Sequence, residues 1–170
     1  MDLLKQTNPA FPQEVRRYGC RFMSMLAIPQ LYLSKPLDIS QIMAIYHVGK
    51  SDPLVIGENC RTGKNEHVLM QHALALLGKP GIRCRQVGKI KGETVVFWNS
   101  SAPYQYIVGH WVTLGLDGHW TLFDPNGIEV YDPWEPREAK GIEGLEDGYV
   151  IRKRVVDRRL LYRVWETIAA

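Results

Sequence analysis

Residues 109–125 read Gly-His-Trp-Val-Thr-Leu-Gly-Leu-Asp-Gly-His-Trp-Thr-Leu-Phe-Asp-Pro, and this stretch decides the fold class. Two runs of β-branched and aromatic residues flank the pair Asp117-Gly118, which is typical of a β-hairpin turn. A hairpin joins neighbouring antiparallel strands, so we expect an antiparallel sheet in this half of the chain.

The register of this hairpin determines which side chains meet. A two-residue turn places His110 opposite Pro125. A three-residue turn pairs Gly115 with His119 and places His110 opposite Asp124, with Cβ atoms about 5 Å apart. The second register gives the carboxylate a position from which it can orient the imidazole. In that register His119 faces away from Asp124 and is the weaker catalytic candidate.

The chain of 170 residues changes character near residue 80. Apolar residues recur at helical spacing before this point, and short β-branched and aromatic runs follow it. We therefore expect one α+β domain over residues 1–170, with helices within about 14–80 and a sheet within about 81–167. The expected helices begin near Gly19-Cys20 (stopping or kinking at Pro29), at Asp38 with a capping box to Gln41, and at Asn65. The expected strands are 82–87, 94–98, 106–114, 120–123, 128–131 and a part of 149–165.

Composition excludes several classes of protein. Apolar residues make up 45% and charged residues 23% of the chain, as in ordinary globular proteins. The first residues carry no signal peptide and no apolar run is long enough for a membrane span, so we expect a cytoplasmic protein. The net charge is only +3. Residues 152–163 alternate arginine with apolar residues, which indicates a strand with one solvated face, and we expect no nucleic-acid partner.

Cys20 is the candidate nucleophile among three cysteines. At the start of a helix, unpaired N–H groups and the helix dipole favour a thiolate. The alternative is a small buried apolar residue, which is the usual role of a free cysteine. Cys60 and Cys84 look structural, and no Cys-x-x-Cys pair suggests zinc. The loop 57–64 lacks the spacing of a phosphate-binding loop. We expect no metal and no cofactor.

Three stretches resemble the papain-like cysteine peptidases, and most of all the bacterial peptidases that cut double-glycine leader peptides. Residues 18–26 (Tyr-Gly-Cys-Arg-Phe-Met-Ser-Met-Leu) are similar to the helix that carries the nucleophile. Residues 109–114 look like the histidine strand, and residues 123–127 like the Asp-Pro segment that orients the histidine. The helices-then-sheet order matches that fold over most of the chain, although the motifs cover only about thirty residues.

The resemblance implies a thiol hydrolase in which Cys20 attacks an acyl carbon, His110 transfers the proton and Asp124 orients the imidazole. Such peptidases complete the oxyanion hole with a glutamine six residues before the cysteine. Glu14 occupies that position here, and Gln13, one residue further away, is the candidate donor. Gly19 replaces the usual aspartate before the cysteine.

The implied substrate is a peptide or a peptidoglycan-like amide. Two alternatives stay open beside the peptidase: a phage-type cell-wall amidase or endopeptidase, and an inactive papain-like domain that binds peptides in a groove lined by tryptophans (Trp98, Trp111, Trp120 and Trp134).

Overall fold

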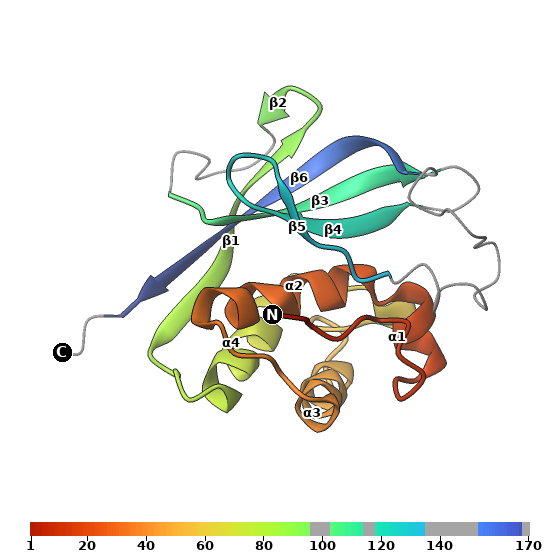
Figure 1. Ribbon diagram of the computed structural model, residues 1–170, viewed down its shortest axis with the longest axis vertical. Coiled ribbons are helices and arrows are strands. Elements are labelled where there is room, and N and C mark those ends of the chain that lie inside the picture. Colours follow the sequence, from red (N-terminus) through yellow and green to blue (C-terminus); the bar gives the residue numbers. More distant parts are fainter. Residues whose placement is uncertain (96–102, 114–117, 135–152, 168–170) are drawn as a thin grey trace.

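The computed structural model describes residues 1–95, 103–113, 118–134 and 153–167. A layer of helices lies on one side of a sheet (Figure 1), so the predicted α+β class and the order of helices before strands are confirmed. The helical elements are α1 (Gln13–Tyr18), α2 (Cys20–Leu33), α3 (Ile39–Lys50), the 3-10 turn η1 (Glu58–Cys60) and α4 (His67–Leu76).

The strands form a six-stranded sheet in the order β2-β1-β6-β3-β4-β5, and each pairing between described strands is antiparallel. The last strand, β6, lies between β1 and β3, so it is an inner strand that joins the two halves of the sheet. The strands are β1 (Ile82–Lys91), β2 (Thr94–Val95), β3 (Tyr106–Thr113), β4 (His119–Phe123), β5 (Glu129–Tyr131) and β6 (Lys153–Glu166).

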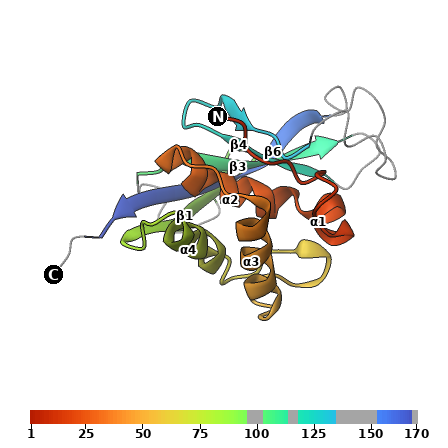
Figure 2. The same ribbon diagram turned by 60° about the horizontal axis from the view of Figure 1, so that its bottom comes forward.

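The helix α2 lies directly against the sheet, and α3 lies on the side of it that faces away from the strands (Figures 1 and 2). A helix that is apolar on all sides is buried, and the residues from Phe22 to Gln30 are all buried. The predicted start at Cys20 is confirmed. The helix continues through Pro29 to Leu33, however, because apolar burial on both sides of the proline offsets its cost of about 3 kcal/mol.

The cap predicted for the next helix is confirmed. The Asp38 carboxylate accepts a hydrogen bond from the Gln41 backbone N–H at 2.8 Å, and the Gln41 side chain accepts one from the Asp38 N–H at 3.0 Å. These bonds satisfy two backbone donors that a helix N-terminus otherwise leaves free. The helix α4 begins at His67, two residues beyond the predicted Asn65 cap.

The predicted registers of the β3–β4 hairpin are wrong. His110 pairs with Trp120 rather than with Asp124 or Pro125, a shift of four residues from the preferred register. The two rings contact each other, with centroids 4.7 Å apart. The sequence interpretation therefore assigned the wrong partner to His110.

Burial explains the observed register. It places Val108 opposite Leu122 and Ile107 opposite Phe123, and all four side chains are buried. The preferred register would have set Ile107 and Val108 against the turn that follows β4, where no apolar partner stands. Cross-strand apolar pairs stabilise a sheet, so hydrophobic pairing outweighed the local turn signal.

Candidate active site

Cys20 is the first residue of α2, where the sequence predicts a nucleophile. Backbone hydrogen bonds from Trp120, Arg21 and Cys20 itself act on the thiol and favour its ionised form. Burial acts more strongly in the other direction, and with the negative charge of Asp132 it raises the pKa of the thiol to about 11. The resting site therefore holds a protonated thiol in a ring of N–H donors.

The backbone of Trp120 ties the start of α2 to β4. The N–H of Trp120 acts on the Cys20 thiol, and its carbonyl accepts a hydrogen bond from the Ser24 hydroxyl at 3.2 Å. Cys20 and Ser24 are four residues apart and share one face of the helix. The N–H of Trp120 belongs to the peptide bond that joins it to His119, so the thiol lies at the backbone between these two residues.

His119 and Asp132 form a buried pair next to this thiol. The Nε2 atom of His119 lies 2.7 Å from Oδ1 of Asp132, and the same oxygen accepts the Trp134 backbone N–H at 2.9 Å. The side chain of His119 is fully buried. Burial would raise the pKa of Asp132, but His119 and Lys153 bring it to about 2, so the carboxylate is ionised and acts only as an acceptor.

The ionised carboxylate fixes the tautomer of His119. Because Asp132 can only accept, the proton of the neutral imidazole must sit on Nε2. The other nitrogen, Nδ1, is then a bare acceptor, and it is buried without a hydrogen-bond partner. Burial lowers the pKa of His119, although Asp132 acts to raise it. The structure thus provides an unused proton acceptor on the residue that precedes Trp120, whose backbone acts on the Cys20 thiol.

Packing from two segments holds this pair in place. The indole of Trp134 stacks on the His119 ring with centroids 3.4 Å apart and planes 12° apart. On the other side, the N-terminal segment binds the backbone that carries the aspartate. The Lys5 ammonium donates to the Asp132 carbonyl at 2.6 Å, and the Gln6 N–H donates to the Pro133 carbonyl at 2.9 Å.

His110 and Asp124, two members of the predicted triad, are not brought together. His110 has a different carboxylate, with its Nδ1 2.6 Å from Oδ1 of Asp157. Asp124 instead closes the turn after β4, accepting the N–H groups of Asn126 and Ile128 at 2.9 and 3.0 Å. The cause is the hairpin register, which moves Asp124 beyond the reach of His110.

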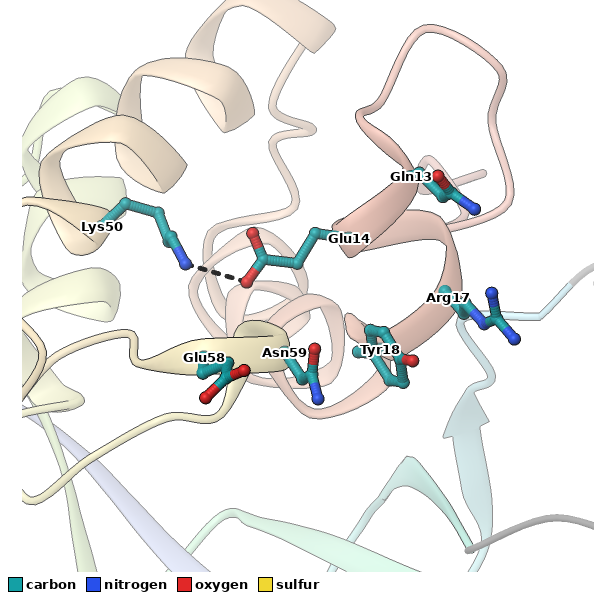
Figure 3. A pocket seen from close by; sticks show the side chains of 7 residues that line it. All are labelled: Gln13, Glu14, Arg17, Tyr18, Lys50, Glu58 and Asn59. Carbon is teal, nitrogen blue, oxygen red and sulfur yellow. Dashed lines mark hydrogen bonds and ion pairs between the residues drawn. The ribbon is translucent and has the colours of Figure 1, made fainter.

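Gln13, the predicted oxyanion donor, is exposed at the start of α1. It lines a polar pocket of about 450 Å³ between α1, the end of α3 and η1 (Figure 3). Tyr18 lines the same pocket and lies two residues before Cys20, which places the pocket beside the nucleophile helix. No hydrogen bond joins the Gln13 side chain to another residue of the described chain, so its role stays a prediction.

Glu14 forms the inner wall of this pocket. Its carboxylate pairs with the Lys50 ammonium at 2.9 Å (Figure 3) and accepts hydrogen bonds from the Tyr46 hydroxyl and, at 2.7 Å, from the Cys60 N–H. Burial raises the pKa of Glu14, but these three partners together bring it below its ordinary value. The carboxylate thus anchors η1 to α1 rather than standing free to act on a substrate.

The sequence interpretation missed Asp132 and Lys153, and it named Trp134 only as a possible lining residue of a peptide groove. A signal for the first of them is present in the sequence. Gly-His-Trp occurs at 109–111 and at 118–120, and Asp-Pro occurs at 124–125 and at 132–133. The spacing from histidine to aspartate is 14 residues in the first combination and 13 in the second. Spacing alone does not separate them, because only the register shows which histidine meets which aspartate.

The His119–Asp132 pair predicts how stability depends on pH. The lowered pKa of Asp132 in the folded chain stabilises it above pH 4, and this contribution is lost as pH falls from about 4 to about 2. The lowered pKa of His119 means that the unfolded chain takes up its proton first as pH falls below 6.5, which also destabilises the fold. We expect the urea midpoint to fall from pH 7.5 to 5 and again to 3. A His119→Gln variant should lose most of the first fall, and an equal fall in both proteins would contradict this account.

Within the described residues, no group of three or more His, Cys, Asp or Glu side chains is placed to hold a metal ion. None of the helices in the described ranges has both the length and the apolar character that a membrane crossing requires. Comparisons with known proteins leave the family open: no protein-family profile, no curated protein and no solved structure matches this chain.

Proposed function

We propose that the protein is a thiol hydrolase with a papain-like fold, in which Cys20, His119 and Asp132 form the catalytic triad. The observation that carries this proposal is the buried Nδ1 of His119, which has no hydrogen-bond partner and belongs to the residue next to the peptide N–H that acts on the Cys20 thiol. In this proposal Cys20 is the nucleophile, His119 the base that accepts its proton, and Asp132 the carboxylate that orients the imidazole, the three roles that thiol catalysis requires.

The order of the chemical steps follows from the resting state, in which the thiol of Cys20 and the imidazole of His119 are both uncharged. Sγ of Cys20 attacks the acyl carbon of an amide while its proton passes to Nδ1 of His119. The imidazolium that forms is stabilised by Asp132 and then gives the same proton to the leaving amine. A water molecule, deprotonated by His119, hydrolyses the thioester and returns the thiol to its resting form.

The N–H groups around the thiol supply the second element of catalysis. Those of Cys20 and Trp120 already act on the sulfur. When sulfur bonds to the acyl carbon, the carbonyl oxygen lies close to the same donors and gains their stabilisation as it becomes negative. Backbone donors can therefore form an oxyanion hole even though the glutamine position is occupied by Glu14.

The substrate class follows from the site's surroundings. The pocket beside the nucleophile helix is lined by charged and amide side chains, with Tyr18 as its aromatic residue. It suits a polar part of a peptide or of a peptidoglycan-like stem rather than an apolar side chain. Peptide hydrolysis is the leading proposal, and a cell-wall amide is a neighbouring substrate for the same mechanism.

Alkylation of the thiol by iodoacetamide tests the triad without a known substrate. A thiol with a pKa of about 11 is ionised to about one part in 10⁴ at pH 7. With His119 as a base, the rate should rise through a midpoint below pH 6.5 and then stay level to about pH 9. In His119→Ala the level region should vanish, and the rate at pH 7 should fall about 1,000-fold.

His110→Ala is the matched control, since it removes the other histidine of a Gly-His-Trp sequence. Its profile should stay within about threefold of the parent. Cys60 and Cys84 are buried, so labelling followed by peptide mass spectrometry reports on Cys20. A level profile in His119→Ala, or its loss in His110→Ala, would refute the triad.

Hydrolysis is tested with synthetic peptides and purified peptidoglycan. The new termini that cleavage produces must be absent with Cys20→Ala. Peptide binding without cleavage would identify an inactive binding domain.

A further inference from the structure

Lys153, the first residue of β6, is an almost buried lysine that the triad does not explain. Its side chain is 7% exposed. The ammonium lies 2.9 Å from Oδ2 of Asp132, the oxygen that does not meet Nε2 of His119. Burying a lysine is costly unless its charge is paired, so its position at the second oxygen of the triad carboxylate requires an explanation.

A network of hydrogen bonds holds the ammonium where it is. Glu129 accepts from Lys153 with both oxygens, at 3.1 and 3.2 Å, and also from the Thr121 hydroxyl at 2.8 Å. Thr121 in turn accepts the indole N–H of Trp111 at 2.8 Å, and Lys153 lies over that indole ring, 5.1 Å from its centroid. The network joins β3, β4, β5 and β6, so the ammonium has a fixed direction.

We propose that Lys153 is a positioning residue that enforces the tautomer of His119, an inference that rests on the proposed function. By donating to Oδ2, it requires an acceptor on its own side of Asp132. Donors from His119 and Trp134 require an acceptor on the other side. Only an ionised carboxylate satisfies both sides, so Nε2 of His119 keeps its proton and Nδ1 stays available for the proton of Cys20.

The inference predicts that asparagine cannot replace Asp132 while Lys153 is present. Its carboxamide has one accepting and one donating end. If the oxygen faces Lys153, the NH₂ group faces Nε2 of His119 and drives the proton to Nδ1, where it blocks the reaction. With Lys153 removed, the NH₂ group can occupy the side that the ammonium leaves. The amide oxygen can then accept a hydrogen bond from Nε2 of His119.

A double-mutant cycle on the full chain tests this coupling through the iodoacetamide rate at pH 7. Asp132→Asn should slow alkylation about 1,000-fold in the parent and no more than about 30-fold in Lys153→Met. ¹⁵N shifts of His119 should show a proton on Nε2 in the parent and on Nδ1 in Asp132→Asn. Arg154→Met, an exposed cation on the same strand, is the control and should leave the penalty unchanged.

The pH profile gives a further measurement. The charged groups that act on His119 are Asp132, Lys153 and Glu129, and Lys153 opposes its protonation. The acid midpoint should therefore rise in Lys153→Met and stay in place in Arg154→Met. Equal penalties for Asp132→Asn in both backgrounds, or an Nε2 proton that persists in Asp132→Asn, would overturn the role of Lys153. Insensitivity to His119→Ala would instead refute the triad itself. The shift measurement on Asp132→Asn decides the matter even if Lys153→Met does not fold.

Discussion

Replacing Asp132 by asparagine is expected to slow the alkylation of Cys20 about 1,000-fold at pH 7, and to slow hydrolysis by a similar factor. Proton transfer by a positioned base contributes about 10²- to 10⁴-fold to such rates. An imidazole whose proton sits on the wrong nitrogen loses that contribution. The substitution changes no volume, so the loss reports on hydrogen-bond direction rather than on packing.

The matched control for this prediction is Asp124→Asn, which makes the same change in the other Asp-Pro pair. A single oxygen of Asp124 accepts both of its backbone N–H groups. Asparagine offers an equivalent acceptor and favours such turns, so alkylation should stay within about threefold of the parent. A large loss in Asp124→Asn with little change in Asp132→Asn would restore the pairing that the sequence predicted. Rates are measured by mass spectrometry over time, and circular dichroism checks that both variants are folded.

The contrast between the two aspartates shows what the sequence can predict here. Helical periodicity and capping residues predicted the start of α2 and the cap of α3, because these features depend on neighbours in the chain. The assignment of Cys20 as nucleophile likewise depends on local position. The choice between His110 and His119 depends on a register set by buried cross-strand pairs, among them Val108 with Leu122.

Lys153 could not be predicted from sequence for a related reason. It reaches Asp132 only because β6 crosses the sheet to lie between β1 and β3, a pairing that no local pattern encodes. In the sequence it is one more basic residue at the edge of an arginine-rich strand. The proposed positioning role of Lys153 follows only from its burial and from its hydrogen bonds to Asp132 and Glu129 in the folded chain.

Glu66 carries the largest expected effect on stability. Its carboxylate is buried and accepts hydrogen bonds from the Arg21 guanidinium at 2.8 Å, the Thr62 hydroxyl at 2.8 Å and the Tyr162 hydroxyl at 2.7 Å. Three separate segments therefore meet at one charge: the start of α2, the loop after η1, and β6. The guanidinium of Arg21 also lies over the Trp120 ring, 5.1 Å from its centroid, next to the peptide that acts on the thiol.

Glu66→Ala should lower the free energy of unfolding by about 3 kcal/mol, because removing one partner of a buried pair leaves the other charge uncompensated. Arg21 keeps some access to solvent, which holds the loss to the lower end of the usual range. Urea unfolding should show a lower midpoint with an unchanged slope. Glu58→Ala, an exposed glutamate in η1, should change stability by less than about 0.5 kcal/mol. If the two variants unfold at the same midpoint, the three hydrogen bonds at Glu66 contribute no net stability. If Arg21→Met restores stability to Glu66→Ala, the cost lies in the uncompensated guanidinium, as the burial of this pair predicts.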